Sequence, residues 1–172
     1  LVKKAKNTEF GKDHNFSSIK NHKDFQNQVP IRDYEALKPY VDRVVAGEKN
    51  ILWPGQPLYF AKTSGTTSGA KYIPITKESI RTHINSARDA LLNYFLKTKN
   101  YSPINGKHMF LQGSPKLDKK NGVFIGRLSG ISAHYIPKLF LNNRKPSWNT
   151  NCIEDWEKKV DNIIKETVGE KM

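Results

Sequence analysis

The stretch Thr63-Ser64-Gly65-Thr66-Thr67-Ser68-Gly69-Ala70-Lys71 places five hydroxyl side chains, two glycines and one lysine within nine residues. Glycines allow positive φ and a close backbone approach, so successive N–H groups can converge on an anion while the hydroxyls supply further donors. The lysine adds a point charge. The stretch therefore predicts a phosphate-binding loop at residues 63–71.

The segments on both sides of this loop predict strands. Residues 58–62 have the length and aromatic content of a buried strand, and residues 71–76 are typical of a second one, with Pro74 restricting it to a sheet edge or a position without a ladder hydrogen bond. A P-loop instead requires G-x-x-x-x-G-K-[ST] followed by a helix. The spacing and the strand that follows Lys71 therefore argue against a Walker-type nucleotide triphosphatase.

Apolar residues at helical spacing predict helices elsewhere in the chain. One begins near Thr76 and is expected to be well packed along the face formed by Ile80, Ile84, Ala87, Leu91 and Phe95. Another begins at Asp33 as its N-cap and ends at Gly47, with Pro39 expected to divide it into two short helices. A third covers residues 153–164. With the strands, these helices predict an α/β fold with mixed sheet segments and flanking helices.

Composition limits the classes of function. The chain has 172 residues and a net charge of +13, of which +7 comes from residues 101–150. Its single cysteine, Cys152, excludes an internal disulfide framework, and its five histidines lack metal-binding spacing. Apolar runs are too short to span a bilayer, and no signal peptide opens the chain, so we expect a cytoplasmic protein without a membrane partner.

The basic charge leaves two interpretations open. A basic patch is the electrostatic footprint of nucleic-acid binding, so a basic nucleic-acid-binding module without catalysis is the alternative function. No helix-turn-helix, zinc-finger or RNP-type motif accompanies the charge, however. A polyanionic small ligand, or an acidic remainder of a longer protein, explains the charge equally well.

The chain resembles the auxin-responsive acyl-acid amido synthetases, a branch of the adenylate-forming superfamily that includes luciferases and acyl-CoA synthetases. The resemblance covers most of the chain. It is carried by residues 8–12, Val29-Pro30, Tyr34-Glu35, residues 38–40, residues 51–55, residues 60–69 and residues 71–74. The resemblance implies that the chain is an incomplete N-terminal domain, over residues 1–172, of a larger adenylate-forming enzyme.

The activity that the resemblance implies has two steps. A carboxylic acid is first coupled to ATP, with release of pyrophosphate, and the acyl group is then transferred to the amine of an amino acid. ATP and Mg²⁺ are the expected cofactors, and small carboxylic acids and amino acids are the expected partners. The resemblance assigns the ATP phosphates to Thr63, Ser64, Gly65, Thr66, Thr67, Ser68, Gly69 and Lys71.

The resemblance also points to an acyl pocket shaped by the helix after the loop and by residues 128–137. Thr82, Ser132 and His134 are the candidate substrate-binding residues of this region. No catalytic residue is assigned, because carboxylate attack on phosphorus requires fixed donors rather than a nucleophilic side chain. The motifs that hold adenine and ribose are expected beyond residue 172.

Overall fold

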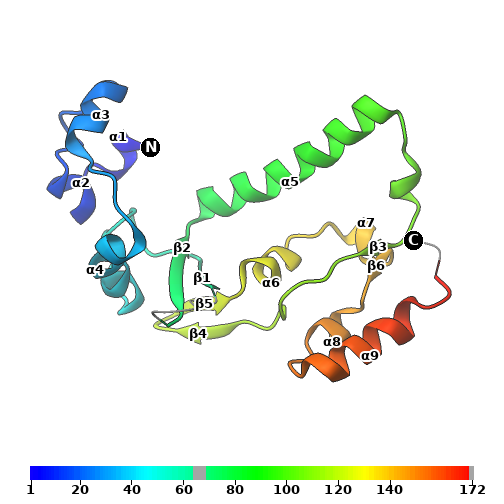
Figure 1. Cartoon of the computed structure of the whole chain (residues 1–172). Coiled ribbons are helices and arrows are strands. Elements are labelled where there is room, and N and C mark those ends of the chain that lie inside the picture. Colours follow the sequence, from blue (N-terminus) through cyan, green and yellow to red (C-terminus); the bar gives the residue numbers. More distant parts are fainter. Residues whose placement is uncertain (64–68, 171–172) are drawn as a thin grey trace. The chain divides into compact units, whose positions relative to one another are not determined.

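The computed structural model describes residues 1–63 and 69–170, apart from the side chain of Leu139. These residues form both helices and short strands, which confirms the predicted α/β class (Figure 1). Among the described residues, no helix is both long and apolar enough to cross a membrane.

Contacts between residues divide the chain into two compact units. Unit 1 contains Leu1–Lys77 and Lys119–Ile125, and unit 2 contains Glu78–Asp118 and the chain from Gly126 onward. The division does not decide whether residues 1–172 form one incomplete domain, so that statement stays a prediction.

In the described part of unit 1, helices accompany a sheet with the strand order β2-β1-β5-β4, in which β1 and β2 are antiparallel. The elements are α1 (Val2–Ala5), α2 (Glu9–Asp13), α3 (His22–Gln28), α4 (Tyr34–Val45), β1 (Tyr59–Thr63), β2 (Lys71–Ile75), β4 (Asp118–Lys120) and β5 (Val123–Gly126). The two strands predicted on either side of the loop are confirmed as β1 and β2. The position of β2 at the edge of the sheet also agrees with the restriction that Pro74 imposes.

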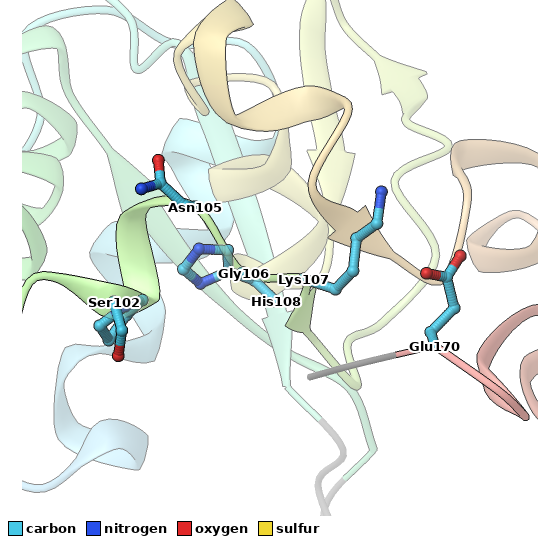
Figure 2. A pocket seen from close by; sticks show the side chains of 7 residues that line it. Ser102, Asn105, Gly106, Lys107, His108 and Glu170 are labelled. Atoms are coloured by element: carbon cyan, nitrogen blue, oxygen red, sulfur yellow. The ribbon is translucent and has the colours of Figure 1, made fainter.

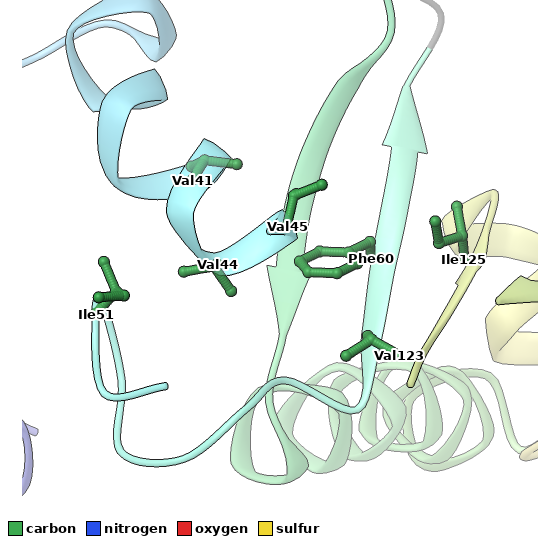
Figure 3. Close-up of a cluster of buried hydrophobic side chains, with 7 residues drawn as sticks. All are labelled: Val41, Val44, Val45, Ile51, Phe60, Val123 and Ile125. Carbon is green, nitrogen blue, oxygen red and sulfur yellow. The ribbon is translucent and has the colours of Figure 1, made fainter. Parts of the chain in front are cut away.

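The core of unit 1 forms where α4 meets the sheet. Phe60 of β1 has 0% of its surface exposed and is clustered with Val44 and Val45 of α4, and Figure 3 shows Val45 beside its ring. The spacing of these valines from Val41 puts all three on one helical face. The buried cluster consists of Val41, Val44, Val45, Ile51, Phe60, Val123 and Ile125. Burial of this face ties α4 to β1.

Local sequence fixes both ends of α4. The side chain of Asp33 accepts a hydrogen bond from the Ala36 N–H at 2.9 Å, as expected of an N-cap. At the other end, Gly47 has a φ of +102° and its N–H donates to the Val44 carbonyl. The Glu48 N–H donates to the Arg43 carbonyl, and the two bonds together form a Schellman motif. The predicted N-cap and the predicted end at Gly47 are both confirmed.

The prediction that Pro39 divides this helix is wrong, because α4 runs unbroken from Tyr34 to Val45 with Pro39 inside it. A proline in a helix removes one N–H, whose acceptor here would be the carbonyl of Glu35, and costs about 3 kcal/mol. Glu35 is exposed, so water can hydrogen-bond that carbonyl. Burial of the valine face outweighs the remaining cost.

A tight turn joins β4 to β5, and a side chain of this turn is hydrogen-bonded to the end of α4. Asn121 and Gly122 have φ values of +47° and +85°, the left-handed conformation that a two-residue I′ hairpin turn requires at both positions. The Asn121 amide Nδ2 also donates to the carbonyl of Val45 at 2.8 Å, at the last residue of α4. One side chain thus serves both the turn and the end of the helix.

Replacing Asn121 tests these two contributions separately. Asn121→Ala should destabilise unit 1 by about 1–3 kcal/mol, because it removes the bond to Val45 and puts an ordinary residue at positive φ. Asn121→Gly should cost less, since glycine keeps the turn and loses only the bond. Urea denaturation of both variants measures the difference. Equal stability of both variants and the parent chain would contradict this account of the turn.

The described part of unit 2 contains several helices and a short parallel pair of strands. The elements are α5 (Lys77–Thr98), η1 (Ser102–Ile104), β3 (His108–Met109), α6 (Leu128–Ala133), α7 (Lys138–Leu141), β6 (Arg144–Lys145), α8 (Trp148–Asn151) and α9 (Trp156–Thr167). Strands β3 and β6 run parallel, with His108 opposite Arg144 and Met109 opposite Lys145.

Helix α5 is present as predicted, but the prediction that its apolar face is well packed is wrong. Ile80 and Phe95 are 3% and 8% exposed, whereas Leu91 is 38% exposed. Leu92 and Leu96 are also exposed. Helical periodicity correctly identified Ile80 and Phe95, near the two ends of the face, as buried. It does not show whether other residues pack against the part of the face between them.

Glu166 connects α9 to α8. Its carboxylate accepts hydrogen bonds from the Ser147 N–H, from the Ser147 hydroxyl at 2.7 Å and from the Thr150 hydroxyl. Burial favours the neutral form, but the hydrogen bonds from Thr150 and Ser147 outweigh it, so the pKa of Glu166 lies below its ordinary value of 4.5.

This lowered pKa predicts an acid-sensitive contact. A carboxyl group whose folded pKa is depressed stabilises the folded state above its unfolded pKa and loses that contribution as pH falls through the folded pKa. The loss should therefore occur below about pH 4.5. Glu166→Gln should be less stable than the parent chain at neutral pH, and the difference should shrink on acidification. Thermal denaturation of the two chains from pH 7 to pH 3 measures it, and a difference that is independent of pH would contradict the assignment.

Candidate phosphate-binding site

The candidate loop joins the ends of two antiparallel strands. Thr63 is the last residue of β1 and Lys71 the first of β2, and the two are opposite each other in the register. This pairing brings the two residues that flank the segment to neighbouring positions in the sheet. The arrangement confirms that the sequence between the strands is not the strand-to-helix turn of a P-loop.

Five of the predicted phosphate-binding residues lie outside the described residues. They are Ser64, Gly65, Thr66, Thr67 and Ser68. Their role stays a prediction, and the structure informs the candidate site through the residues at its margins, Thr63, Gly69 and Lys71.

Gly69 has the backbone conformation expected of a glycine in an anion-binding loop. Its φ is +81°, a region that residues with a side chain rarely adopt. A Cβ atom at this position would meet no atom within 4 Å. Glycine is therefore favoured at position 69 by the positive φ of the backbone, and not by a lack of space for a side chain.

The Lys71 ammonium lies against the first turn of α4. Its Nζ is 3.4 Å from a carboxylate oxygen of Glu35 and 4.9 Å from the centre of the Tyr34 ring. The side chain remains 34% exposed. Lys71 is thus held at the base of the loop by a carboxylate, and a phosphate that bound it would compete with Glu35.

Tyr34 also holds the edge strand from outside the sheet. Its hydroxyl accepts the Tyr72 N–H at 2.9 Å and donates to the Tyr72 carbonyl at 3.3 Å. A neighbouring strand would otherwise satisfy such groups, so the tyrosine fixes β2 directly beside Lys71. Sequence reasoning missed this role, because no spacing rule relates a residue of α4 to a backbone pair 38 residues later.

The candidate substrate residues Thr82, Ser132 and His134 lie in unit 2. The side chain of each makes a hydrogen bond to a backbone carbonyl. The Thr82 hydroxyl donates to Glu78 at 3.1 Å, and the Ser132 hydroxyl donates to Leu128 at 2.9 Å. The His134 Nε2 is 2.8 Å from the Pro115 carbonyl, which identifies that nitrogen as the protonated one. These bonds place the side chains without testing a role in binding.

Unit 2 contains a hollow of about 570 Å³ around the loop before β3 (Figure 2). Its polar lining includes Ser102, Asn105, Lys107, His108 and Glu170. None of the described residues predicted for the site lines this hollow. Within the described residues, no group of three or more His, Cys, Asp or Glu side chains could hold a metal ion.

Comparisons with known proteins identify relatives across most of the chain. Residues 1–158 match the model of the GH3 family N-terminal domain. The indole-3-acetic acid-amido synthetase GH3.17 of Arabidopsis thaliana is 30% identical over 79% of this chain and 22% of its own length. The jasmonoyl–L-amino acid synthetase JAR4 of Nicotiana attenuata is 27% identical over 59% of this chain and 18% of its own length.

Solved structures show the same fold. The GH3.15 acyl acid amido synthetase superposes with a TM-score of 0.67 at 21% identity, over 82% of this chain and 25% of that one. The structure of the Arabidopsis GH3.15 enzyme with 2,4-DB gives 0.66 over 90% of this chain and 27% of that one.

The chain therefore spans only about a fifth to a quarter of the length of these relatives. The family-model match nevertheless covers more than half of its residues, and the fold agrees with that of a solved member. The resemblance seen in the sequence is confirmed: the chain belongs to the GH3 family, whose N-terminal domain it matches over residues 1–158.

Proposed function

We propose that the chain is the N-terminal part of an ATP-dependent acyl-acid amido synthetase. The proposed enzyme couples a small carboxylic acid to ATP, releases pyrophosphate, and then transfers the acyl group to the amine of an amino acid with release of AMP. One relative is named as an indole-3-acetic acid-amido synthetase and another as a jasmonoyl–L-amino acid synthetase, which supports this class of substrates. The predicted cytoplasmic location is part of the proposal.

The observation that carries the proposal is the hydroxyl- and glycine-rich loop between two antiparallel strands. Carboxylate attack on the α-phosphorus brings negative charges together, so fixed donors are needed to stabilise the developing charge. Thr63 and Gly69 stand at the two margins of the loop, and Gly69 already has positive φ. In this proposal the hydroxyls and N–H groups of residues 63–69 bind the ATP phosphates.

Mg²⁺ is the proposed metal cofactor and would supply charge compensation on the phosphates. Mg²⁺ is commonly held by substrate phosphates with one or two carboxylates. Thr82, Ser132 and His134 remain the proposed contacts of the acyl substrate.

Several basic side chains of the described residues pair with acidic side chains of the same chain. Arg43 bonds to Glu9 and Glu48, and Lys145 bonds to Glu170. Nothing in the family match or in the fold favours a nucleic-acid-binding module. We therefore propose no nucleic-acid partner.

Removing two loop hydroxyls tests the proposal. Ser64→Ala combined with Thr66→Ala should slow carboxylate-dependent ATP–pyrophosphate exchange by about 100-fold or more, the usual effect of losing a transition-state donor. The assay uses the full-length polypeptide, and Ser17→Ala with Thr98→Ala, both outside the loop, is the matched control. Unchanged exchange in the loop variant would contradict the role of the loop.

Lys71 and Glu35 test whether the lysine takes part in ATP binding. If it binds phosphate, Lys71→Ala should raise the KM for ATP about 10-fold or more, since a charge-assisted bond contributes about 1.5–3 kcal/mol. Glu35→Gln should leave the KM unchanged or lower it, because it removes the competing carboxylate. An increase in KM of equal size in both variants would instead assign the pair a structural role.

A further inference from the structure

A cation in the core of unit 2 has no acidic partner among the described residues. Arg144 is only 8% exposed, and Lys159, the other buried basic residue there, is 6% exposed. Lys159 donates to the carbonyl of Asn151 at 2.8 Å and to that of Gln112 at 3.3 Å, so its charge is solvated by the backbone. The buried Nε and Nη2 atoms of Arg144 make no such bond to a described carbonyl.

Two hydrogen-bond donors of the Arg144 guanidinium have no acceptor among the described residues. Its Nε and Nη2 atoms are buried and make no hydrogen bond to any described residue. These two N–H groups lie on one edge of the planar group, the edge that binds both oxygens of a carboxylate in parallel. Leaving a buried charge unpaired is costly, so an unused bidentate edge indicates a missing acceptor.

His108, on the neighbouring strand, presents a third buried polar group without a partner among the described residues. It is opposite Arg144 in the parallel register of β3 and β6, which puts the two side chains on the same face of the strand pair. Its Nε2 is also buried without a partner among the described residues. The His108 ring stacks at 12° on Phe110, and the Arg144 guanidinium lies 6.0 Å from the centre of the same ring.

The acids of the surrounding chain do not supply the acceptor. Residues 101–150 contain eight lysines and arginines but one acid, Asp118. Of the nearby acids, Glu166 is bonded to Ser147 and Thr150 and Glu170 to Lys145. Burial alone lowers the pKa of Arg144, with no carboxylate acting in the opposite direction.

We propose that Arg144 and His108 form a binding site for one carboxylate group. The Nε–Nη2 edge of Arg144 donates to both carboxylate oxygens, and the Nε2–H tautomer of His108 donates to one of them. The Nε and Nη2 atoms are buried in this conformation, and Phe110, whose ring centre lies 6.0 Å from the guanidinium, is 47% exposed. The site does not depend on the proposed adenylation activity.

Two sources can provide this carboxylate: a soluble acid, or an Asp or Glu side chain of a longer polypeptide. The first source is tested on residues 1–172 by replacing sodium chloride with sodium acetate at constant ionic strength. Acetate at about ten times its Kd should raise the Tm by about 3–6 °C. Arg144→Met should abolish the rise, and Arg144→Lys, which keeps the charge but loses the fork, should reduce it strongly. Lys138→Gln, at an exposed cation, is the matched control and should keep the full rise.

The second source is tested when acetate has no effect. Arg144→Met should then lower the Tm of the full-length polypeptide by several degrees but leave unchanged or raise that of residues 1–172, because only the longer protein would pair the charge. The comparison of the two polypeptides rests on the proposed larger enzyme, whereas the acetate experiment does not.

Three results would overturn the proposal. They are stabilisation by inorganic phosphate without stabilisation by acetate, an acetate effect that survives in Arg144→Met, and no penalty for Arg144→Met in either polypeptide when acetate is inactive. The last would show that water or a local rearrangement satisfies the guanidinium.

Discussion

The antiparallel pairing of β1 with β2 is the constraint on which the candidate site depends. It brings Thr63 opposite Lys71, so both ends of a hydroxyl-rich segment are fixed at one place in the sheet. A loop with anchored ends loses less conformational entropy when it closes on a ligand than one with free ends. Because β2 is an edge strand, its outer side needs another support, and the Tyr34 hydroxyl provides it at Tyr72.

Helix α4 connects this site to the core of unit 1. Its valine face packs on Phe60 of β1, while its first turn supplies Tyr34 to the β2 backbone and Glu35 to Lys71. The same helix therefore fixes both strands that carry the loop. Its position depends in turn on the Asp33 cap, the Gly47 motif and the bond from Asn121 to its last carbonyl.

Sequence reasoning succeeded where the deciding interactions are local. Hydrophobic pattern and turn residues predicted β1, β2 and α5, and the Asp33 and Gly47 signals predicted the limits of α4. Pro39 misled because its cost is local, whereas the compensation comes from a helical face packed against a distant strand. The contacts of Tyr34, Arg144 and His108 join segments far apart in sequence, so no spacing could have predicted them.

The proposed binding of the ATP phosphates by the segment between β1 and β2 can be measured in solution. Amide hydrogen exchange over residues 63–71, measured on the full-length polypeptide, tests it most directly. ATP with Mg²⁺, and pyrophosphate with Mg²⁺, should slow exchange in this segment, whereas adenosine should not. Exchange unchanged by ATP and pyrophosphate, or slowed equally by adenosine, would contradict it.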